Sequence, residues 1–254
     1  MDASDSLQTE PNQNTEKPNE INGGAEFIDH LRLATPQLRI MIEYHKRNLP
    51  VDQYTNLLND IRAMHDKFSS SLAGYHPGAE RAREAHRLIN VAIDQSTQVK
   101  ASCKKGCGAC CSLEVEITHD EGALLAQIVE SGVQIDRPRL ELQAKRERQG
   151  IEWKNSGDLS NRCVFLGPDQ NCRIYESRPA ICRKVVVASD PKECNNPEGK
   201  PQPILIPMAE IALTAALNQP GNTNLSLSKS LLAALGSSTN CEISAAESTA
   251  VLSF

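Results

Sequence analysis

Four of the chain's nine cysteines lie within nine residues, at Cys103, Cys107, Cys110 and Cys111, in the spacing C-x3-C-x2-C-C. Several sulfur atoms can point toward one place only if the backbone between them bends sharply, and Gly106 and Gly108 permit the positive φ angles of such a bend. Zinc in a structural site takes four ligands, and an iron-sulfur cluster usually takes four cysteines. The sequence therefore predicts a metal-binding loop.

A second group of cysteines follows, and its members are more widely spaced: Cys163, Cys172, Cys182 and Cys194. The segments 163–166 and 172–175 flank a turn-rich connection, 167–171, which predicts a short hairpin that positions cysteines. The two groups supply eight thiols, and we predict all eight as metal ligands. Eight thiols suffice for two sites of four ligands, or for one site with four cysteines to spare, and the spacing leaves both divisions open.

The composition bears on location and on the classes of partner. The formal net charge of -5 and the pI near 5.7 argue against general nucleic-acid binding, which normally requires a basic surface. The sequence shows neither a stretch of apolar residues long enough to cross a bilayer nor the pattern of a signal peptide. We therefore expect a cytoplasmic protein with no membrane contact, in which reduced thiols favour metal binding over disulfides.

Hydrophobic periodicity predicts a mostly α protein with a small cysteine-rich metal-binding subdomain that contains a short hairpin. The expected divisions are a disordered tail (1–24), an N-terminal helical region (25–99), the cysteine-cluster domain (100–196), a C-terminal helical segment (197–236) and a flexible tail (237–254).

Individual elements can also be expected. Helical spacing predicts helices over 26–47, divided by Pro36, and over 51–72, 79–99, 118–131, 137–149, 207–217 and 225–235. Alternating residues predict a strand over 113–117. Thr118 and Glu121 match a capping box, which marks the start of the helix that follows.

Other side chains near the cysteines have simpler expected roles. Seven cations adjoin the cysteines in sequence and are expected to offset thiolate charge: Lys104, Lys105, Arg162, Arg173, Arg178, Arg183 and Lys184. His119 is expected as a surface residue in the first turn of a helix, and Cys241 as an incidental thiol. The pair Cys107 and Cys110 has the spacing of a redox motif, but no alternating strand-helix pattern supports that interpretation.

The cysteines and their neighbours resemble the YkgJ-type cysteine-cluster family, a zinc- or iron-chelating domain with a CxxCxxCC-like motif. The resemblance extends over residues 100–195 and rests on the eight cysteines together with Val164-Phe165-Leu166, Arg173-Ile174-Tyr175, Arg178-Pro179 and Arg183. It implies zinc or an iron-sulfur cluster as cofactor. The x3 gap between Cys103 and Cys107 departs from the family's plain spacing.

Two classes of function follow from these expectations. The first is a noncatalytic protein that binds a metal or cluster, with a protein partner recognised by the N-terminal helices. The alternative is a metal- or cluster-dependent enzyme such as a protein-modifying methyltransferase, because flagellin lysine N-methylase is similar in carrying a cysteine cluster. No phosphate-binding glycine loop or nucleophile elbow is found in the sequence, and no residue is predicted as catalytic.

Overall fold

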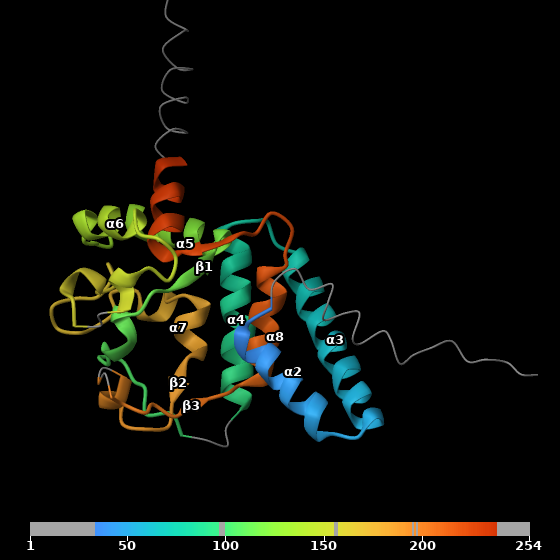
Figure 1. Ribbon diagram of the computed structural model, residues 1–254. Coiled ribbons are helices and arrows are strands. Elements are labelled where there is room, and N and C mark those ends of the chain that lie inside the picture. The colour runs from blue at the N-terminus through green and yellow to red at the C-terminus, as the bar shows by residue number, and fades with distance from the viewer. Residues whose placement is uncertain (1–33, 97–99, 155–156, 195, 197, 238–254) are drawn as a thin grey trace, which may run out of the picture.

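The computed structural model describes residues 34–96, 100–154, 157–194, 196 and 198–237. The fold is mostly helical, as predicted, with a few short strands. Figure 1 shows long helices packed together on one side and the short elements of the cysteine-rich region on the other. The tails expected over 1–24 and 237–254 lie almost wholly outside the described residues.

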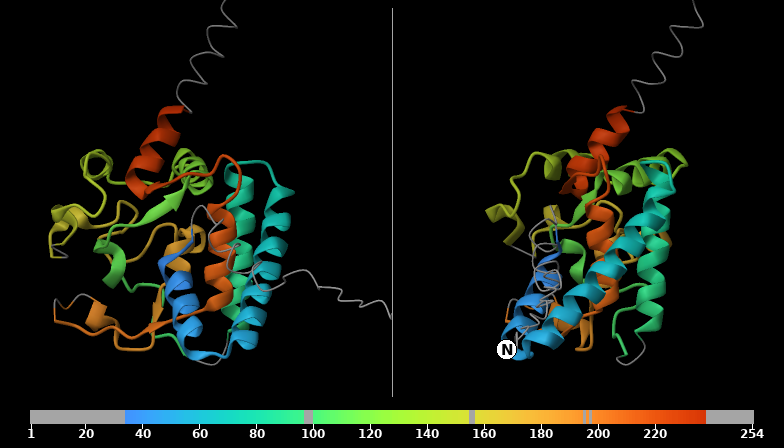
Figure 2. Two further views of the ribbon diagram at one scale, coloured as in Figure 1. Left: turned by 45° about the vertical axis from the view of Figure 1, so that its right-hand side comes forward. Right: turned by 90° about the vertical axis from the view of Figure 1, so that its right-hand side faces the viewer.

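Four helices form the first layer: α2 (Pro36–Asn48), α3 (Val51–Ala73), α4 (Ala79–Gln95) and α8 (Pro207–Leu217). In two further views α8 lies beside α3 and α4 (Figure 2), and contacts between these helices confirm the arrangement. Every residue from 209 to 217 is buried, and this stretch includes the alanines at 209, 212, 215 and 216. Small side chains let neighbouring helices approach closely, so α8 forms the centre of this layer.

The helix boundaries follow local sequence signals. Thr35 caps α2, its Oγ1 accepting from the Leu38 N–H at 3.2 Å, and Pro36 occupies the first turn, where its missing N–H costs nothing. Of the helix predicted over 26–47, the part from Pro36 onward is described, and it forms α2. Helices α3 and α4 match the predictions for 51–72 and 79–99, except that α4 ends at Gln95.

The second layer begins with β1 (Glu116–Thr118), which pairs antiparallel with β4 (Asn224–Ser226), a strand that the sequence did not predict. Helix α5 (His119–Glu130) starts at the capping box, in which the Thr118 side chain accepts from the Glu121 N–H and the Glu121 side chain accepts from the Thr118 N–H. The helix predicted over 225–235 is described over 227–237.

Helix α6 (Arg137–Ala144) is shorter than the predicted 137–149. The chain leaves the helix because Arg146 donates to the Ser160 hydroxyl at 2.6 Å and also to Asn161, and Gln149 adopts a left-handed φ of 54°. These long-range contacts outweigh the helical preference of a charged segment.

The cysteines lie on and between very short elements: η1 (Ala109–Ser112), η2 (Ile151–Lys154), η3 (Leu159–Asn161), η4 (Tyr175–Ser177), α7 (Ala180–Lys184), β2 (Val186–Val187), η5 (Pro191–Cys194) and β3 (Pro203–Ile204). Strands β2 and β3 pair antiparallel. The hairpin predicted around 167–171 is a single antiparallel bridge between Leu166 and Cys172, closed by the Gly167 N–H donating to the Asn171 carbonyl at 2.9 Å.

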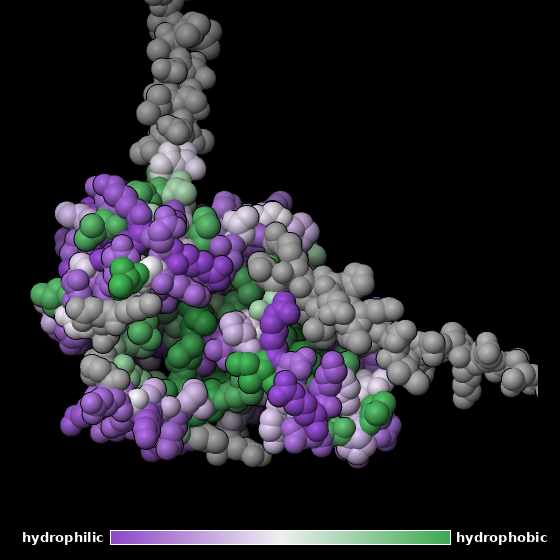
Figure 3. Space-filling model, viewed as in Figure 1, coloured by the Kyte–Doolittle hydropathy of each residue, from purple (hydrophilic) through white to green (hydrophobic). Residues whose placement is uncertain are grey.

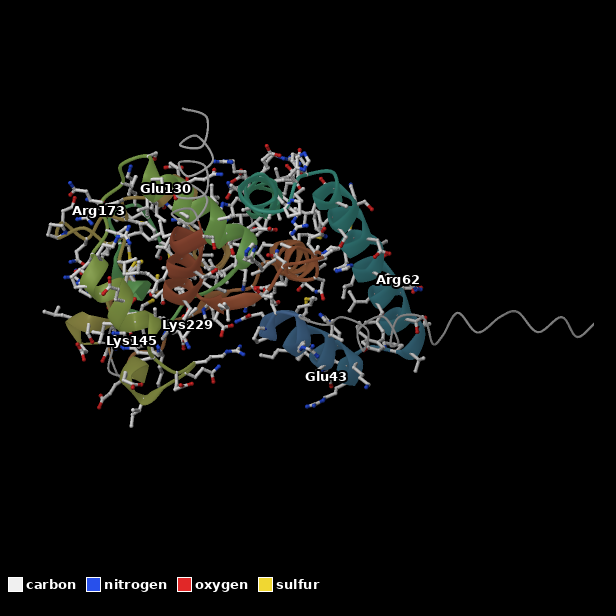
Figure 4. All side chains as sticks on the ribbon, turned by 90° about the horizontal axis from the view of Figure 1, so that it is seen from above. Glu43, Arg62, Glu130, Lys145, Arg173 and Lys229 are labelled. Atoms are coloured by element: carbon white, nitrogen blue, oxygen red, sulfur yellow. The ribbon has the colours of Figure 1, made fainter. Side chains whose placement is uncertain are left out.

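The two layers enclose a recess. Hydrophobic side chains are visible in a hollow between the α2 side and the cysteine-rich side (Figure 3), and a cavity of about 190 Å³ there is lined by Thr35, Ile181 and Leu213, among others. Seen from above, Arg62 on α3 lies at one edge of the molecule, while Arg173 and Lys145 lie at the opposite edge (Figure 4). In the described residues, no helix has both the length and the apolar character needed to cross a membrane.

Candidate metal centre

The first cysteine of the run is held against strand β2. The Ser102 N–H donates to the Val187 carbonyl at 2.8 Å, and the Val187 N–H donates in return to the Cys103 sulfur at 3.4 Å. Cys103 is therefore positioned by a segment more than eighty residues away in sequence.

The two glycines of the run act differently. Gly106 has a φ of 87°, as the predicted bend requires, so any side chain there would strain the backbone. Gly108 has a φ of -91°, which corrects the expectation of a positive angle. What restricts Gly108 is space, because a Cβ atom would lie 2.8 Å from Gln170 Oε1 and 3.3 Å from Leu166 Cδ1. The turn 167–171 thus packs on the cysteine loop.

The second half of the run contacts two segments that carry later cysteines, one at Cys163 and one that ends at Cys194. Helix η1 holds Cys110 and Cys111, and the Cys163 N–H donates to the Cys111 carbonyl at 2.6 Å. Helix η1 also contacts η5, whose last residue is Cys194. The backbone therefore brings segments separated by fifty to more than eighty positions along the chain to the same place.

Cys172 and Cys182 complete the arrangement. Cys172 lies at the bridge with Leu166, and its carbonyl accepts from the Tyr175 N–H at 3.2 Å. Cys182 lies on α7, whose first residue, Ala180, donates its N–H to the buried Glu121 carboxylate at 2.7 Å. The capping-box glutamate of α5 therefore also fixes the helix that holds Cys182.

The thiols differ in acidity because their surroundings differ. Burial raises the pKa of Cys163 to about 11 and also raises the pKa values of Cys172, Cys182 and Cys194. Cys110 and Cys111 are adjacent in sequence, and their pKa values shift in opposite directions. A hydrogen bond from Cys111 lowers the pKa of Cys110 to about 6, and the same hydrogen bond, together with burial, raises the pKa of Cys111. The thiolate form is thus favoured at Cys110, and its negative charge raises the pKa values of neighbouring thiols.

The thiols also act on one another electrostatically. Negative charge on Cys110 raises the pKa of every member of a group of five: Cys111, Cys163, Cys172, Cys182 and Cys194. Charge on Cys103 and Cys107 raises the pKa of Cys194 as well. Electrostatic effects thus link all eight predicted residues, either directly or through Cys110 and Cys194.

The cluster fits a thiophilic metal by its donor set, although its side chains are not arranged around a common point. Among the described residues, no three Cys, His, Asp or Glu side chains lie close enough together to hold one ion. All eight cysteines are partly exposed and form no disulfide. The backbones of η1, η5 and the turn 167–171 nevertheless lie close together.

The predicted cations divide into different roles. Arg178 and Lys105 both lie over the Tyr175 ring, at 4.1 Å and 5.9 Å from its centroid. Lys184 does not offset thiolate charge, although that role was expected. It is buried and pairs with Glu210 at 2.7 Å. Arg183 donates to the backbone carbonyls of Arg178 and Glu176, so it holds the chain around Cys182. Arg173 is exposed and donates to the Gln134 carbonyl at 3.1 Å.

Two histidines also have defined positions. His119 is exposed at the start of α5, in the position expected of a surface residue. His86 is buried, with Nε2 2.9 Å from Glu121 Oε1. Sequence reasoning did not connect His86 to the site; its position on the buried face of a helix, beside Ile89, was the one signal that could have done so.

Residues 102–200 match the CxxCxxCC family, described as "Putative zinc- or iron-chelating domain". Comparisons with curated proteins and with solved structures give no match. The matched segment, called the CxxCxxCC domain below, covers less than half of the 254 residues but includes all eight clustered cysteines, Cys103 among them. The match supports zinc or iron as the cofactor, in agreement with the prediction, and α2, α3, α4 and α8 lie outside it.

Proposed function

We propose that the protein binds zinc or an iron-sulfur cluster in the cytoplasm through Cys103, Cys107, Cys110, Cys111, Cys163, Cys172, Cys182 and Cys194, as a noncatalytic metal-binding protein. The observation that carries this proposal is the convergence of two distant segments, residues 163–171 and η5, on the cysteine loop 103–112. A structural role for cysteines would not require eight of them around one short loop. The protein partner predicted for the N-terminal helices stays a prediction.

Eight thiols suffice for two centres of four ligands or for one centre with four cysteines to spare, and four thiolates meet the usual requirement of zinc or of a cubane cluster. The electrostatic effects link the thiols without dividing them, because charge on Cys110 acts on Cys194 and also on Cys111, Cys163, Cys172 and Cys182. The metal and sulfide content of the purified protein decides between one centre and two.

The raised pKa values of the buried thiols make metal binding depend on pH. Buried thiols with raised pKa values stay protonated at neutral pH, whereas the metal ligand is the thiolate. Binding must therefore release protons, and affinity must rise with pH.

The deciding experiment measures iron, zinc and acid-labile sulfide in protein purified without oxygen, together with its absorption spectrum. Roughly four iron and four sulfide per cluster, with a visible charge-transfer band, would establish an iron-sulfur centre. Colourless protein with about two zinc ions per chain would establish two closed thiolate sites. Protein that contains neither metal, and takes up neither on reconstitution, would contradict the proposal.

Single substitutions test the ligand assignment. Cys110→Ser is expected to lower metal content, because it removes one of the four thiols of the cysteine run. Cys241→Ser is the matched control: Cys241 lies outside both the CxxCxxCC domain and the described residues, and its loss should leave metal content unchanged. Equal metal content in the two variants would refute the assignment.

A further inference from the structure

A cluster of thiolates needs positive charge nearby, and several cations around the cysteines already have other partners. Lys184 is paired with Glu210, and Arg183 is occupied by carbonyl oxygens and by Asn90. Arg139 is paired with Asp136 at 2.8 Å. The charges of these three side chains are therefore engaged elsewhere.

Arg178 differs from these cations. Its Nε atom is buried, and within the described part of the chain it has no hydrogen-bond partner. No carboxylate of the described residues forms an ion pair with its guanidinium group. A buried N–H group without an acceptor costs on the order of 1–3 kcal/mol, so its persistence indicates a partner that the polypeptide itself does not supply.

The surroundings of Arg178 fix its orientation. The guanidinium lies 4.1 Å from the centre of the Tyr175 ring, and Tyr175 is itself tied by its N–H to the Cys172 carbonyl. The carbonyl of Arg178 accepts from Arg183 Nε at 2.7 Å, and Pro179 follows directly. Stacking holds one face of the guanidinium and leaves its N–H edge free to donate.

Arg178 is held close to the backbone of two clustered cysteines. Tyr175, whose ring stacks on the guanidinium, donates its N–H to the Cys172 carbonyl at 3.2 Å, and Cys182 follows Arg178 on α7. The guanidinium therefore lies beside the chain segments that carry Cys172 and Cys182.

We infer that Arg178 is the positioning residue of the metal centre: its Nε–H donates to the Cys172 sulfur in the metal-bound state and offsets the thiolate charge there. The inference rests on the proposed function, since the acceptor it names is a metal-bound thiolate. Metal binding deprotonates the thiol and creates a strong acceptor in place of a weak one. The buried N–H of Arg178, which finds no acceptor in the polypeptide, is the donor that such a thiolate requires.

The test measures zinc binding by purified, reduced, metal-free protein, with Zn²⁺ as the probe and a competing chelator. Arg178→Gln is expected to weaken zinc binding at least tenfold, the usual order for loss of a residue that supports a metal ligand. It should also raise the pH at which half of the zinc is released, because protonated thiols compete better without the cation. Arg178→Lys, which keeps the charge, should recover much of the pH shift.

Arg173→Gln is the matched control, because Arg173 follows Cys172 directly yet is exposed and donates to a backbone carbonyl. Its zinc affinity should stay within twofold of the wild type. Wild-type affinity and pH profile in Arg178→Gln would overturn the inference while leaving the proposed function intact. Equal losses in Arg178→Gln and Arg178→Lys, with lowered melting temperature of the metal-free variants, would show a purely structural role and would also overturn it. Wild-type protein that binds no zinc and no iron would overturn both claims.

Discussion

Glu121 shows how one side chain can join several parts of this molecule. Its carboxylate accepts from the Thr118 N–H in the capping box and from the Ala180 N–H at the start of α7, and it contacts His86 on α4. The residue is 3 % exposed. Burial alone would raise its pKa, but the contacts with His86, Ala180 and Thr118 outweigh that effect and lower it.

Glu121→Gln is expected to reduce the free energy of unfolding by about 2 kcal/mol at neutral pH, since charged hydrogen bonds are lost in a buried place. A carboxyl whose pKa is lower in the folded state stabilises the fold above its ordinary pKa and loses this effect as pH falls. The difference between variant and wild type should therefore shrink as pH falls below about 4.3. Urea unfolding at a series of pH values measures it. A difference that stays constant with pH would show that the carboxylate charge is not responsible.

The sequence could reveal only the local part of the role of Glu121. Thr118 and Glu121 stand three positions apart, and that spacing by itself predicts a capping box. The contacts with His86 and Ala180 join positions 35 and 59 residues away, and no local pattern encodes them. The same limit applies to Lys184: its place beside Cys182 suggested a role in charge compensation, whereas tertiary packing pairs it with Glu210 on α8.

At the scale of elements, the long helices were predictable and the short pieces were not. Helices α3, α4 and α8 have apolar residues repeated over two or more turns, which is a strong signal. Strands β2 and β3 have two residues each and α7 has five, too few for any period to be recognised. The cysteines lie among such short elements, so their identity could be predicted and their arrangement could not.

Helix α5 packs against the C-terminal helix, residues 227–237, at a point where only glycine fits. A Cβ atom at Gly122 would lie 2.4 Å from Ser230 Oγ and 3.2 Å from the Ser230 carbonyl oxygen. Gly122→Ala should therefore force the two helices apart and lower the free energy of unfolding by about 1–3 kcal/mol. Gly236→Ala is the control, because a Cβ there meets nothing within 4 Å and alanine favours a helix. Denaturant unfolding that ranked the two variants equally would contradict this description of the contact.

At the scale of the whole molecule, two hydrophobic clusters are interleaved along the chain. The helical cluster includes Leu72 and Ile89 together with Ala180 of α7, while the cysteine-side cluster includes Phe165, Leu140 and Leu231 of the C-terminal helix. The chain therefore crosses from the cysteine side to the helical layer at α7 and α8, then returns. The linear division at residues 100 and 196 stays a prediction, because neither cluster is confined to one of its segments.

This arrangement predicts an uneven response to metal removal. Around η1, η5 and the turn 167–171, the structure consists of short elements that are held by few buried apolar residues, whereas α3, α4 and α8 share a large apolar core. A metal at one hundred times its dissociation constant stabilises the folded state by about 2.7 kcal/mol. Removing it should raise amide hydrogen exchange mainly in residues 103–112 and 163–194.

Exchange measured by mass spectrometry on metal-loaded and chelator-treated protein, both kept reduced, would test this prediction. Peptides from α3 and α4 that contain Leu72 and Ile89 should stay protected, because their burial does not depend on the cysteines. The increase in amide hydrogen exchange should stop where α7 contacts α4 and α8. Equal deprotection of both layers would instead show that Ala180, Glu121 and the Lys184–Glu210 pair couple the metal centre to the helical core as one cooperative unit.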